Sequence, residues 1–167
     1  MGFTALAQVF AVAITIHNLE EALFLPGWSR HAGRWHPRVG SGEFRFAVLV
    51  LTLAAYACVW LAAVQPVIGT YLLCGYAFAM LVNVFIPHTL GTVVMRRYAP
   101  GTATALVFVL PSTALLLRAA LAEHRIAPLT LAWAGAAGIV VLLASIKPLF
   151  AVGRMLFGGA APEPVNP

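Results

Sequence analysis

The chain has 167 residues, of which 62% are hydrophobic and only 9% are charged, and its formal net charge is +5. Soluble domains carry about a quarter charged residues, so this composition excludes a surface that faces water over most of its area. The apolar runs are continuous and about twenty residues long, which predicts an all-α, polytopic membrane helix bundle rather than a β-barrel. No basic stripe with interleaved aromatic residues occurs outside the loops, so we expect no nucleic-acid partner.

Five apolar segments predict five transmembrane helices, with a four-helix bundle as the alternative. Turn signals separate the segments at Pro26-Gly27, Gln65-Pro66 and Tyr98-Ala99-Pro100-Gly101, and Pro128 suits the first turn of the last helix. The predicted spans are residues 3–25, 44–64, 67–94, 103–121 and 128–150. We expect one transmembrane domain over residues 1–157 and a disordered tail over residues 158–167.

Basic residues are distributed unequally between the ends of these spans. With five spans, only Arg118 and Arg125 fall on one side of the membrane. The positive-inside rule then places the N-terminus outside and the C-terminus in the cytoplasm, and we expect the protein in the bacterial cytoplasmic membrane. The residues on the cytoplasmic side are Arg30, Arg34, Arg38, Arg45, Arg96, Arg97, Lys147 and Arg154.

The first span contains three ionisable side chains, His17, Glu20 and Glu21, in a run that is otherwise apolar. A charged group at the membrane centre costs about 2.5 kcal/mol or more, so such residues face a cavity or a partner rather than lipid. On an ideal helix the two carboxylates lie about 60° to one side of His17 and about 40° to the other. This spacing allows one helix face to direct several groups toward one metal ion or one reacting atom.

The third span supplies Asn83, Pro87 and His88 at nearly the same predicted depth as the first motif. Pro87 lacks the N–H that would bond the carbonyl of Asn83, so that carbonyl needs another partner. Asn83 and His88 lie about 140° apart on an ideal helix. Both can therefore reach one cavity only if the helix is kinked or widened there.

Two blocks of the sequence resemble the HXXEE-motif family, a group of small and largely uncharacterised membrane proteins. The first block is His17-Asn18-Leu19-Glu20-Glu21. The second comprises Asn83, His88, the stretch Arg97-Tyr98-Ala99-Pro100-Gly101-Thr102-Ala103-Thr104, and Pro111. The resemblance covers most of the chain. It implies a membrane protein but little chemistry, so the function has to be argued from the residues.

A metal-dependent membrane enzyme is the first functional hypothesis. His17, Glu21 and His88 match the His₂Glu ligand set of catalytic zinc, and Glu20 would be a general base or a further ligand. The divalent ion, zinc or iron, would lower the pKa of a bound water toward about 7 for attack on an ester, amide or phosphoester. Asn83 is a further candidate catalytic residue. The expected partner is a lipid or another lipophilic small molecule.

Three alternatives remain open. The first is a metal-free isomerase or cyclase, in which Glu20, Glu21 and a histidine move protons. The second is a non-catalytic carrier of an ion or lipid. In the third, the two carboxylates pair with Arg45, Arg96 or Arg97 and only stabilise the bundle. Candidate substrate contacts are Phe24, Phe85, Arg97 and Tyr98.

The remaining polar residues are assigned simpler roles. His31 and His36 lie in a basic, aromatic loop that we expect at the membrane interface, with recognition of an anionic substrate head as the alternative. Glu43 is expected to pair with Arg45 or to close the site from below. The hydroxyl of Thr104 is expected to bond the helix backbone.

Overall fold

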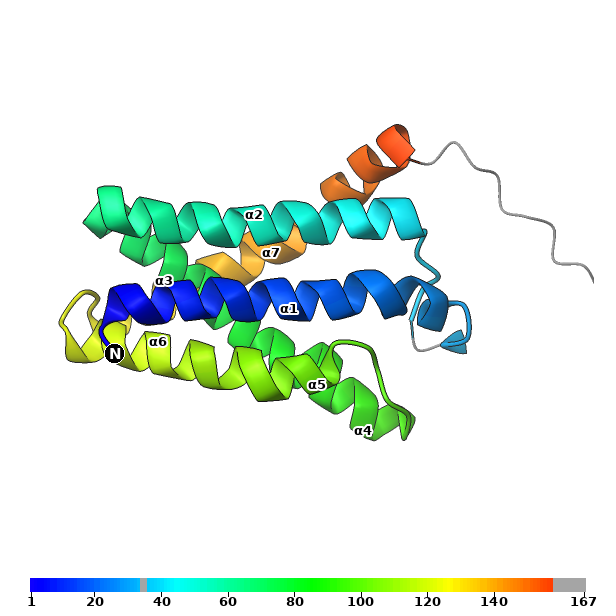
Figure 1. Ribbon diagram of the computed structural model, residues 1–167, viewed down its shortest axis with the longest axis horizontal. Helices are drawn as coiled ribbons and strands as arrows, with labels where there is room; N and C mark the ends of the chain where they lie inside the picture. The colour runs from blue at the N-terminus through cyan, green and yellow to red at the C-terminus, as the bar shows by residue number, and fades with distance from the viewer. Residues whose placement is uncertain (34–35, 158–167) are drawn as a thin grey trace, which may run out of the picture.

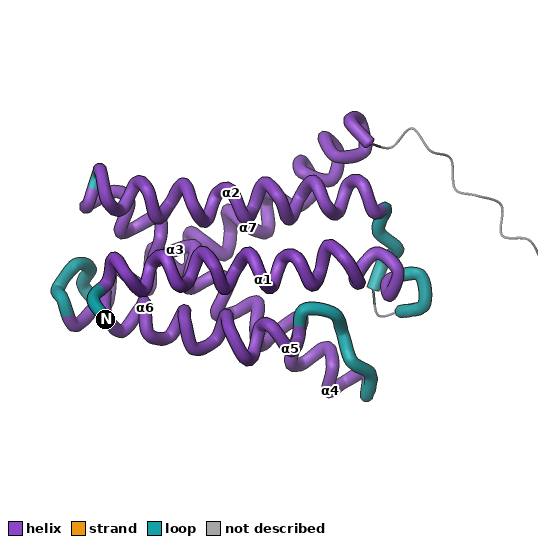
Figure 2. The backbone as a smooth tube through the Cα atoms, in the orientation of Figure 1, coloured by secondary structure: helices purple, strands orange, loops and turns teal. Residues whose placement is uncertain are grey.

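The computed structural model describes residues 1–33 and 36–157, and this part of the chain is a helix bundle without strands (Figures 1 and 2). Five helical segments are long and apolar enough to cross a membrane, which confirms the predicted fold class. They are α1 (Phe3–Ser29), α2 (Ser41–Val64), α3 (Pro66–Asn83) continued by η2 (Val84–Leu90) and α4 (Gly91–Met95), α5 (Thr102–Thr104) continued by η3 (Ala105–Val109) and α6 (Leu110–Ala122), and α7 (Pro128–Phe157). The tail predicted over residues 158–167 lies outside the described residues.

The end of the first span is predicted wrongly, because α1 continues through Pro26 to Ser29. Pro26 has no N–H to donate to the carbonyl of Ala22, four residues earlier. The Nε of Arg45 on α2 donates to that oxygen instead, at 3.1 Å. The Ser29 hydroxyl donates to the carbonyl of Pro26 at 2.9 Å. A contact from a neighbouring helix thus replaces the bond that the proline removes.

The other turns follow their sequence signals. Gln65 separates α2 from α3, and Pro66 is the first residue of α3. The segment Arg96–Gly101 connects the third and fourth spans, and α7 begins at Pro128 as predicted. Its predicted end at residue 150 is too early, because α7 continues to Phe157 with Pro148 inside the helix.

The helix α1 lies between α2 and α6, and α3 crosses behind it (Figure 1). Apolar side chains from these helices fill the centre of the bundle; the largest fully buried ones include Phe10, Ile14, Leu73 and Leu116. Tyr76 of α3 donates to the carbonyl of Leu51 on α2 at 3.0 Å. This core fixes the position of α1, from which the polar motif projects.

The last helix, α7, crosses α3 at glycines. A Cβ atom on Gly138 would lie 2.2 Å from the carbonyl oxygen of Gly75, and one on Gly75 would lie 2.6 Å from that of Ala134. Membrane helices approach closely where such small residues meet. Trp133 and Val140 on α7 are exposed. These exposed apolar side chains suit a helix whose outer face contacts lipid.

The third span is distorted at Pro87, where the sequence predicts a kink, and the distortion is a widening of the helix. Pro87 lies inside η2, which is a π-helical segment. The hydroxyl of Thr89 donates to the carbonyl of Val84, five residues earlier, at 2.8 Å. A π-helix holds more residues per turn than an α-helix. Asn83 and His88 consequently line the same cavity.

The two ends of the bundle differ in charge. The end of α1, the start of α2 and the ends of α4 and α7 lie opposite the chain's N-terminus (Figure 1). Most of the arginines predicted to be cytoplasmic lie at or near these helix ends. At the N-terminal end, Glu123 accepts hydrogen bonds from the Nε of Arg125 at 2.8 Å and the N–H of Phe3 at 2.7 Å. These bonds hold the pKa of Glu123 below its usual value. The direction in which the bundle crosses the membrane stays a prediction.

Candidate functional site

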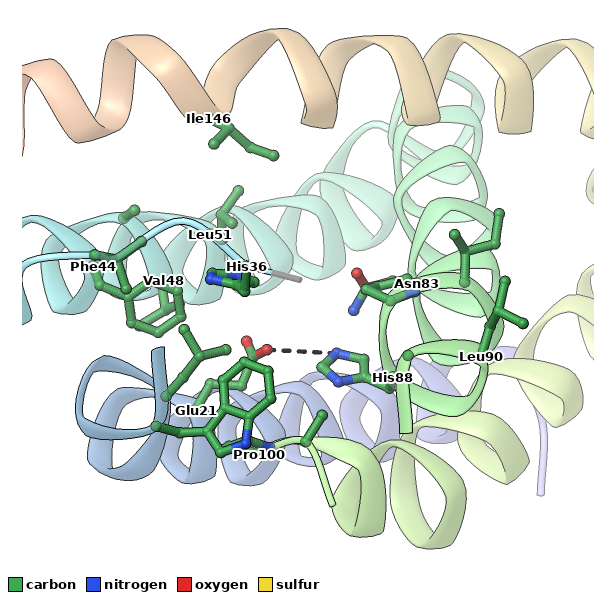
Figure 3. Close-up of a pocket in the computed structure, with 18 of the residues that line it drawn as sticks. Glu21, His36, Phe44, Val48, Leu51, Asn83, His88, Leu90, Pro100 and Ile146 are labelled. Atoms are coloured by element: carbon green, nitrogen blue, oxygen red, sulfur yellow. Dashed lines mark ion pairs between the residues drawn. The ribbon is translucent and has the colours of Figure 1, made fainter. Parts of the chain in front are cut away.

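Three side chains from α1 and η2 meet in what we call the His17–Glu21–His88 cluster. The Nε2 of His17 lies 3.9 Å from Oε2 of Glu21. The Nε2 of His88 lies 3.4 Å from Oε1 of Glu21, as the dashed line in Figure 3 marks. The two imidazole rings are nearly perpendicular, with centroids 4.8 Å apart. One ligand atom of each residue lies within 4.8 Å of the other two. Both histidines are buried, and the Glu21 side chain is 13% exposed.

The neighbouring carboxylate, Glu20, is held by the start of the fourth span instead. Its Oε1 accepts from the N–H of Gly101 at 2.9 Å and from the Tyr98 hydroxyl. Its Oε2 accepts from the hydroxyl of Thr104 at 2.6 Å and from the N–H of Thr104 at 3.3 Å. Four donors with no acceptor suit an ionised carboxylate. Glu20 therefore joins α1 to the Tyr98–Thr104 segment.

Thr104 connects Glu20 to His17. Its Oγ1 lies 3.1 Å from Nδ1 of His17 and 2.6 Å from the carboxylate of Glu20. Because an ionised carboxylate can only accept, the single hydroxyl proton of Thr104 goes to Glu20, and the Nδ1–H of His17 donates to Thr104. The Nε2 of His17 then carries the lone pair. That nitrogen is buried and has no hydrogen-bond partner among the described residues.

Gly101 lies close to all three cluster residues. A Cβ atom there would lie 2.6 Å from Cε1 of His88 and 3.0 Å from both Cε1 of His17 and Cγ of Glu21. Its φ of +91° is also in the region that favours glycine. Any larger residue would displace the cluster.

The alternative in which arginines neutralise the motif is wrong for the part of the chain that the structure describes. There, neither Glu20 nor Glu21 forms an ion pair with an arginine; Glu21 contacts the two histidines. Arg45 donates to the carbonyl of Ala22, and Arg97 donates to that of His31 at 3.3 Å.

Two further polar residues of this region have structural partners. Glu43 pairs with Arg154 at 3.0 Å, not with Arg45, and accepts from the N–H of Gly40 at 2.8 Å. Asn18, inside the motif, donates to the hydroxyl of Thr52 on α2 at 2.7 Å. Each of these side chains joins two segments of the bundle, and neither reaches the cluster.

A cavity of about 530 Å³ adjoins the cluster and is lined by α1, α2, the end of α3, η2, α4, α7 and two loops. Glu21, Asn83 and His88 lie on one side of it, whereas α2 and α7 supply mainly apolar residues on the other (Figure 3). The labelled apolar residues of those two helices are Phe44, Val48, Leu51 and Ile146. Its volume is in the range of sites that bind small organic molecules. The cavity can thus hold an apolar molecule with a polar group at the cluster.

The four residues predicted to contact substrate lie outside this cavity. Phe24 and Phe85 are 60% and 49% exposed on the outside of their helices. Tyr98 bonds Glu20, and Arg97 bonds a loop carbonyl. The aromatic side chains that do line the cavity are Trp28, Phe44 and Phe150. Sequence position could not separate Phe24 and Phe85 from the aromatic residues of the cavity, because all of these lie in helical segments.

Sequence reasoning also missed two residues of the site. The Oγ1 of Thr104 lies 3.2 Å from the backbone carbonyl oxygen of Gly101, close to the helix backbone as expected, but its proton goes to Glu20 and it also contacts His17. Gly101 was assigned only to a turn. The available signal was the family resemblance, whose second block contains both residues. The structure brings that block against the first one.

Fold and site together define a helical membrane protein with a buried histidine–glutamate cluster beside an apolar cavity. The chain belongs to the HXXEE family: residues 8–116 match the family described as "Protein of unknown function with HXXEE motif". It is similar to the uncharacterized protein YrkK of Bacillus subtilis (strain 168), with 37% identity over 146 residues that cover 86% of this chain and 92% of the relative. No solved structure matches the chain significantly.

Proposed function

We propose that this protein is an enzyme of the bacterial cytoplasmic membrane that binds a divalent metal ion, zinc or iron, and hydrolyses a lipophilic substrate. His17, Glu21 and His88 would hold the ion. The observation that carries the proposal is the buried Nε2 of His17, which has no hydrogen-bond partner among the described residues and lies beside a carboxylate and a second imidazole. Burying such a group without a partner is unfavourable, and a metal ion is a partner for all three residues at once.

The spacing of the donor atoms supports this proposal. Tetrahedral zinc binds nitrogen and oxygen at about 2.0–2.1 Å, which places its ligands about 3.3 Å from one another. The Nε2 of His88 lies 3.4 Å from Oε1 of Glu21, the Nε2 of His17 lies 3.9 Å from Oε2, and one ligand atom from each of the three residues fits within 4.8 Å. Small side-chain movements would bring these atoms to the spacing of zinc ligands. Three protein ligands with a further position for water are typical of catalytic zinc.

A bound ion would polarise a carbonyl or phosphoryl oxygen and make water nucleophilic near neutral pH. In this proposal the chain's own residues perform the other steps. Thr104 and Glu20 hold His17 in one tautomer and one orientation, as partners of metal-bound histidines commonly do. The amide of Asn83, on the same side of the cavity as His88, donates to a substrate oxygen. We assign Glu20 to positioning, because its oxygens are already occupied by four donors.

A metal-free isomerase or cyclase is the second candidate. It is favoured by the closeness of Glu21 and His88, whose 3.4 Å separation would allow direct proton transfer after a small shortening, and by the aromatic residues Trp28, Phe44 and Phe150 along the cavity. Aromatic faces stabilise a cationic intermediate.

Metal content tests the first candidate. Purified wild-type protein and the variants H17A, E21Q and H88A would each be loaded with zinc or Fe²⁺ and dialysed. Their metal content would then be measured by inductively coupled plasma mass spectrometry. We expect one ion per wild-type chain and its loss in each variant. E123Q and H124A, at the opposite end of the bundle, are matched controls that should retain the ion. A metal-free wild-type protein after loading would overturn the proposal.

Isotope labelling separates the two candidates. The protein in lipid nanodiscs would be incubated with a panel of lipophilic esters, amides, alkenes and epoxides in D₂O and in H₂¹⁸O. Hydrolysis introduces ¹⁸O into a cleaved product. An isomerase or cyclase introduces deuterium without cleavage, and a carrier leaves the compound unaltered but moves it across a sealed vesicle.

A further inference from the structure

A second cavity, of about 590 Å³, adjoins the first at the charged end of the bundle. Four residues border both cavities: His36, Val39, Ile146 and Phe150. The two cavities are therefore adjacent, and these four residues lie at the boundary between them. A single elongated molecule could therefore occupy both.

The second cavity is basic. Arg38, Lys147 and Arg154 line it together with one carboxylate, that of Glu43. Glu43 is already paired with Arg154 at 3.0 Å. Within the described residues, Arg38 and Lys147 form no ion pair. Their positive charge is consequently not neutralised by the chain around the cavity, and it suits an anion.

A hydrogen-bond donor lies along the first cavity, close to the shared boundary. The indole of Trp28 lines that cavity, and its ring centroid is 5.7 Å from that of His36, one of the shared residues. The Nε1–H of Trp28 is buried and has no partner in the described part of the chain. An indole nitrogen can only donate, so the group it lacks is an acceptor oxygen.

We infer that the joined cavities bind an anionic amphiphile with one hydrocarbon chain. Its phosphate or carboxylate lies against Arg38 and Lys147, an oxygen near the head accepts from Trp28, and the hydrocarbon follows the apolar wall of α2 past Glu21. Basic residues at a bundle end lie at the level of lipid headgroups, where such a molecule presents its charge. Binding of this molecule does not depend on the proposed function, but its identification as the substrate rests on that proposal.

Photo-cross-linking tests the binding. Wild-type protein in phosphatidylcholine nanodiscs would be treated with dodecyl phosphate bearing a terminal diazirine, and the adducts mapped by mass spectrometry. We expect adducts on residues that line the first cavity, such as Phe44, Leu51 and Ile86. R38Q with K147Q should reduce the apparent affinity about thirty-fold, given the contribution of each cation near an anionic group.

A matched control removes the same charge elsewhere. Arg30 and Arg96 are exposed, lie at the same end of the bundle and line neither cavity. R30Q with R96Q should leave the affinity nearly unchanged. An equal loss in both double variants, or adducts only on outer residues, would overturn the inference.

Competition identifies the head and the chain. Unlabelled dodecyl phosphate or dodecanoate should displace the probe. The competitor that displaces it at the lower concentration identifies the preferred head group as phosphate or carboxylate. Equal displacement by dodecanol or by inorganic phosphate would contradict an anionic amphiphile. E21Q should lose metal but keep the cross-link, so failure of the metal proposal and failure of this inference give different results.

Discussion

At the scale of single residues, the two adjacent glutamates of the motif have different surroundings. Successive residues of a helix point about 100° apart. Glu21 consequently reaches the two histidines, whereas Glu20 reaches the Tyr98–Thr104 segment. One carboxylate is available to a ligand, and the other is saturated with hydrogen bonds. The repeated glutamate thus combines a candidate reactive group with a positioning group.

The contact between Thr104 and His17 predicts an effect on metal binding. Replacing Thr104 with Val removes the acceptor for Nδ1–H and the donor to Glu20. We expect metal affinity to fall about 10- to 100-fold, as for other partners of metal-bound histidines. Thr104→Ser should restore it, and Thr15→Val, which removes a hydroxyl bonded to its own helix at Ala11, should not change it. Zinc titration with a competing chelator measures the difference; equal affinity in T104V and wild type would contradict the assigned role.

The close approach of Gly101 predicts a second residue effect. Gly101→Ala combines strain at a positive φ with a Cβ at 2.6 Å from His88, so we expect a loss of roughly 3 kcal/mol in stability together with loss of metal. Gly33→Ala is a matched control, because Gly33 also has a positive φ (59°) but nothing lies within 4 Å of its Cβ position. It should cost about 1 kcal/mol. Unfolding in detergent, followed by circular dichroism, compares the two; similar losses would show that crowding against the cluster is unimportant.

At the scale of elements, prolines act differently according to their neighbours. Pro26 leaves α1 continuous because Arg45 bonds the carbonyl that the proline cannot reach. Pro87 widens the third span into η2 and helps to present His88 to the cavity. The fourth span also contains a π-helical segment, η3, ahead of Pro111. The same residue type thus gives a continuous helix in one place and a widened one in another.

The crossing of α3 and α7 predicts an effect of packing on stability. Gly138→Val would place side-chain atoms against the backbone of Gly75, so we expect a loss of about 1–3 kcal/mol and separation of the two helices. Ala137→Val adds the same branched side chain at a neighbouring, exposed position and should be nearly neutral. The unfolding temperature of the purified proteins in detergent checks this. A neutral G138V would contradict the close crossing.

At the scale of the whole molecule, the site occupies an intermediate position between the core and the basic end. The apolar core of α1, α3 and α6 lies toward the N-terminal end, and many of the residues that line the cavities lie near the ends of α1, α4 and α7. The arrangement places the cluster where both an apolar chain and a charged head can approach it. The proposed amphiphile follows from this combination.

The charge difference between the two ends predicts the orientation in the membrane. We expect the basic end in the cytoplasm and the loop before α7 outside, by the positive-inside rule. In a variant lacking Cys58 and Cys74, a single cysteine at Arg125 should react with an impermeant maleimide on intact cells. One at Arg96 should react only after permeabilisation. The reverse pattern would overturn the predicted orientation.

The sequence by itself determined the class of protein and the residues of the motif. Apolar runs of this length form helices in lipid because the backbone has no water to bond, so five spans could be predicted from composition alone. A distortion at Pro87 was also predictable, because the proline lacks the N–H that an α-helix needs there, but the sequence left open whether the helix would kink or widen.

Only the tertiary structure decided how Glu20 and Glu21 differ and which residues complete the site. The bond between Glu20 and Thr104 joins positions 84 residues apart, and it depends on how the fourth span packs against α1. The same holds for Gly101 beside the histidines and for the aromatic residues of the cavity. A local sequence pattern indicates which side chains lie on each face of a helix, but it does not indicate how neighbouring helices are rotated against one another. That rotation determines which side chains from different helices come into contact.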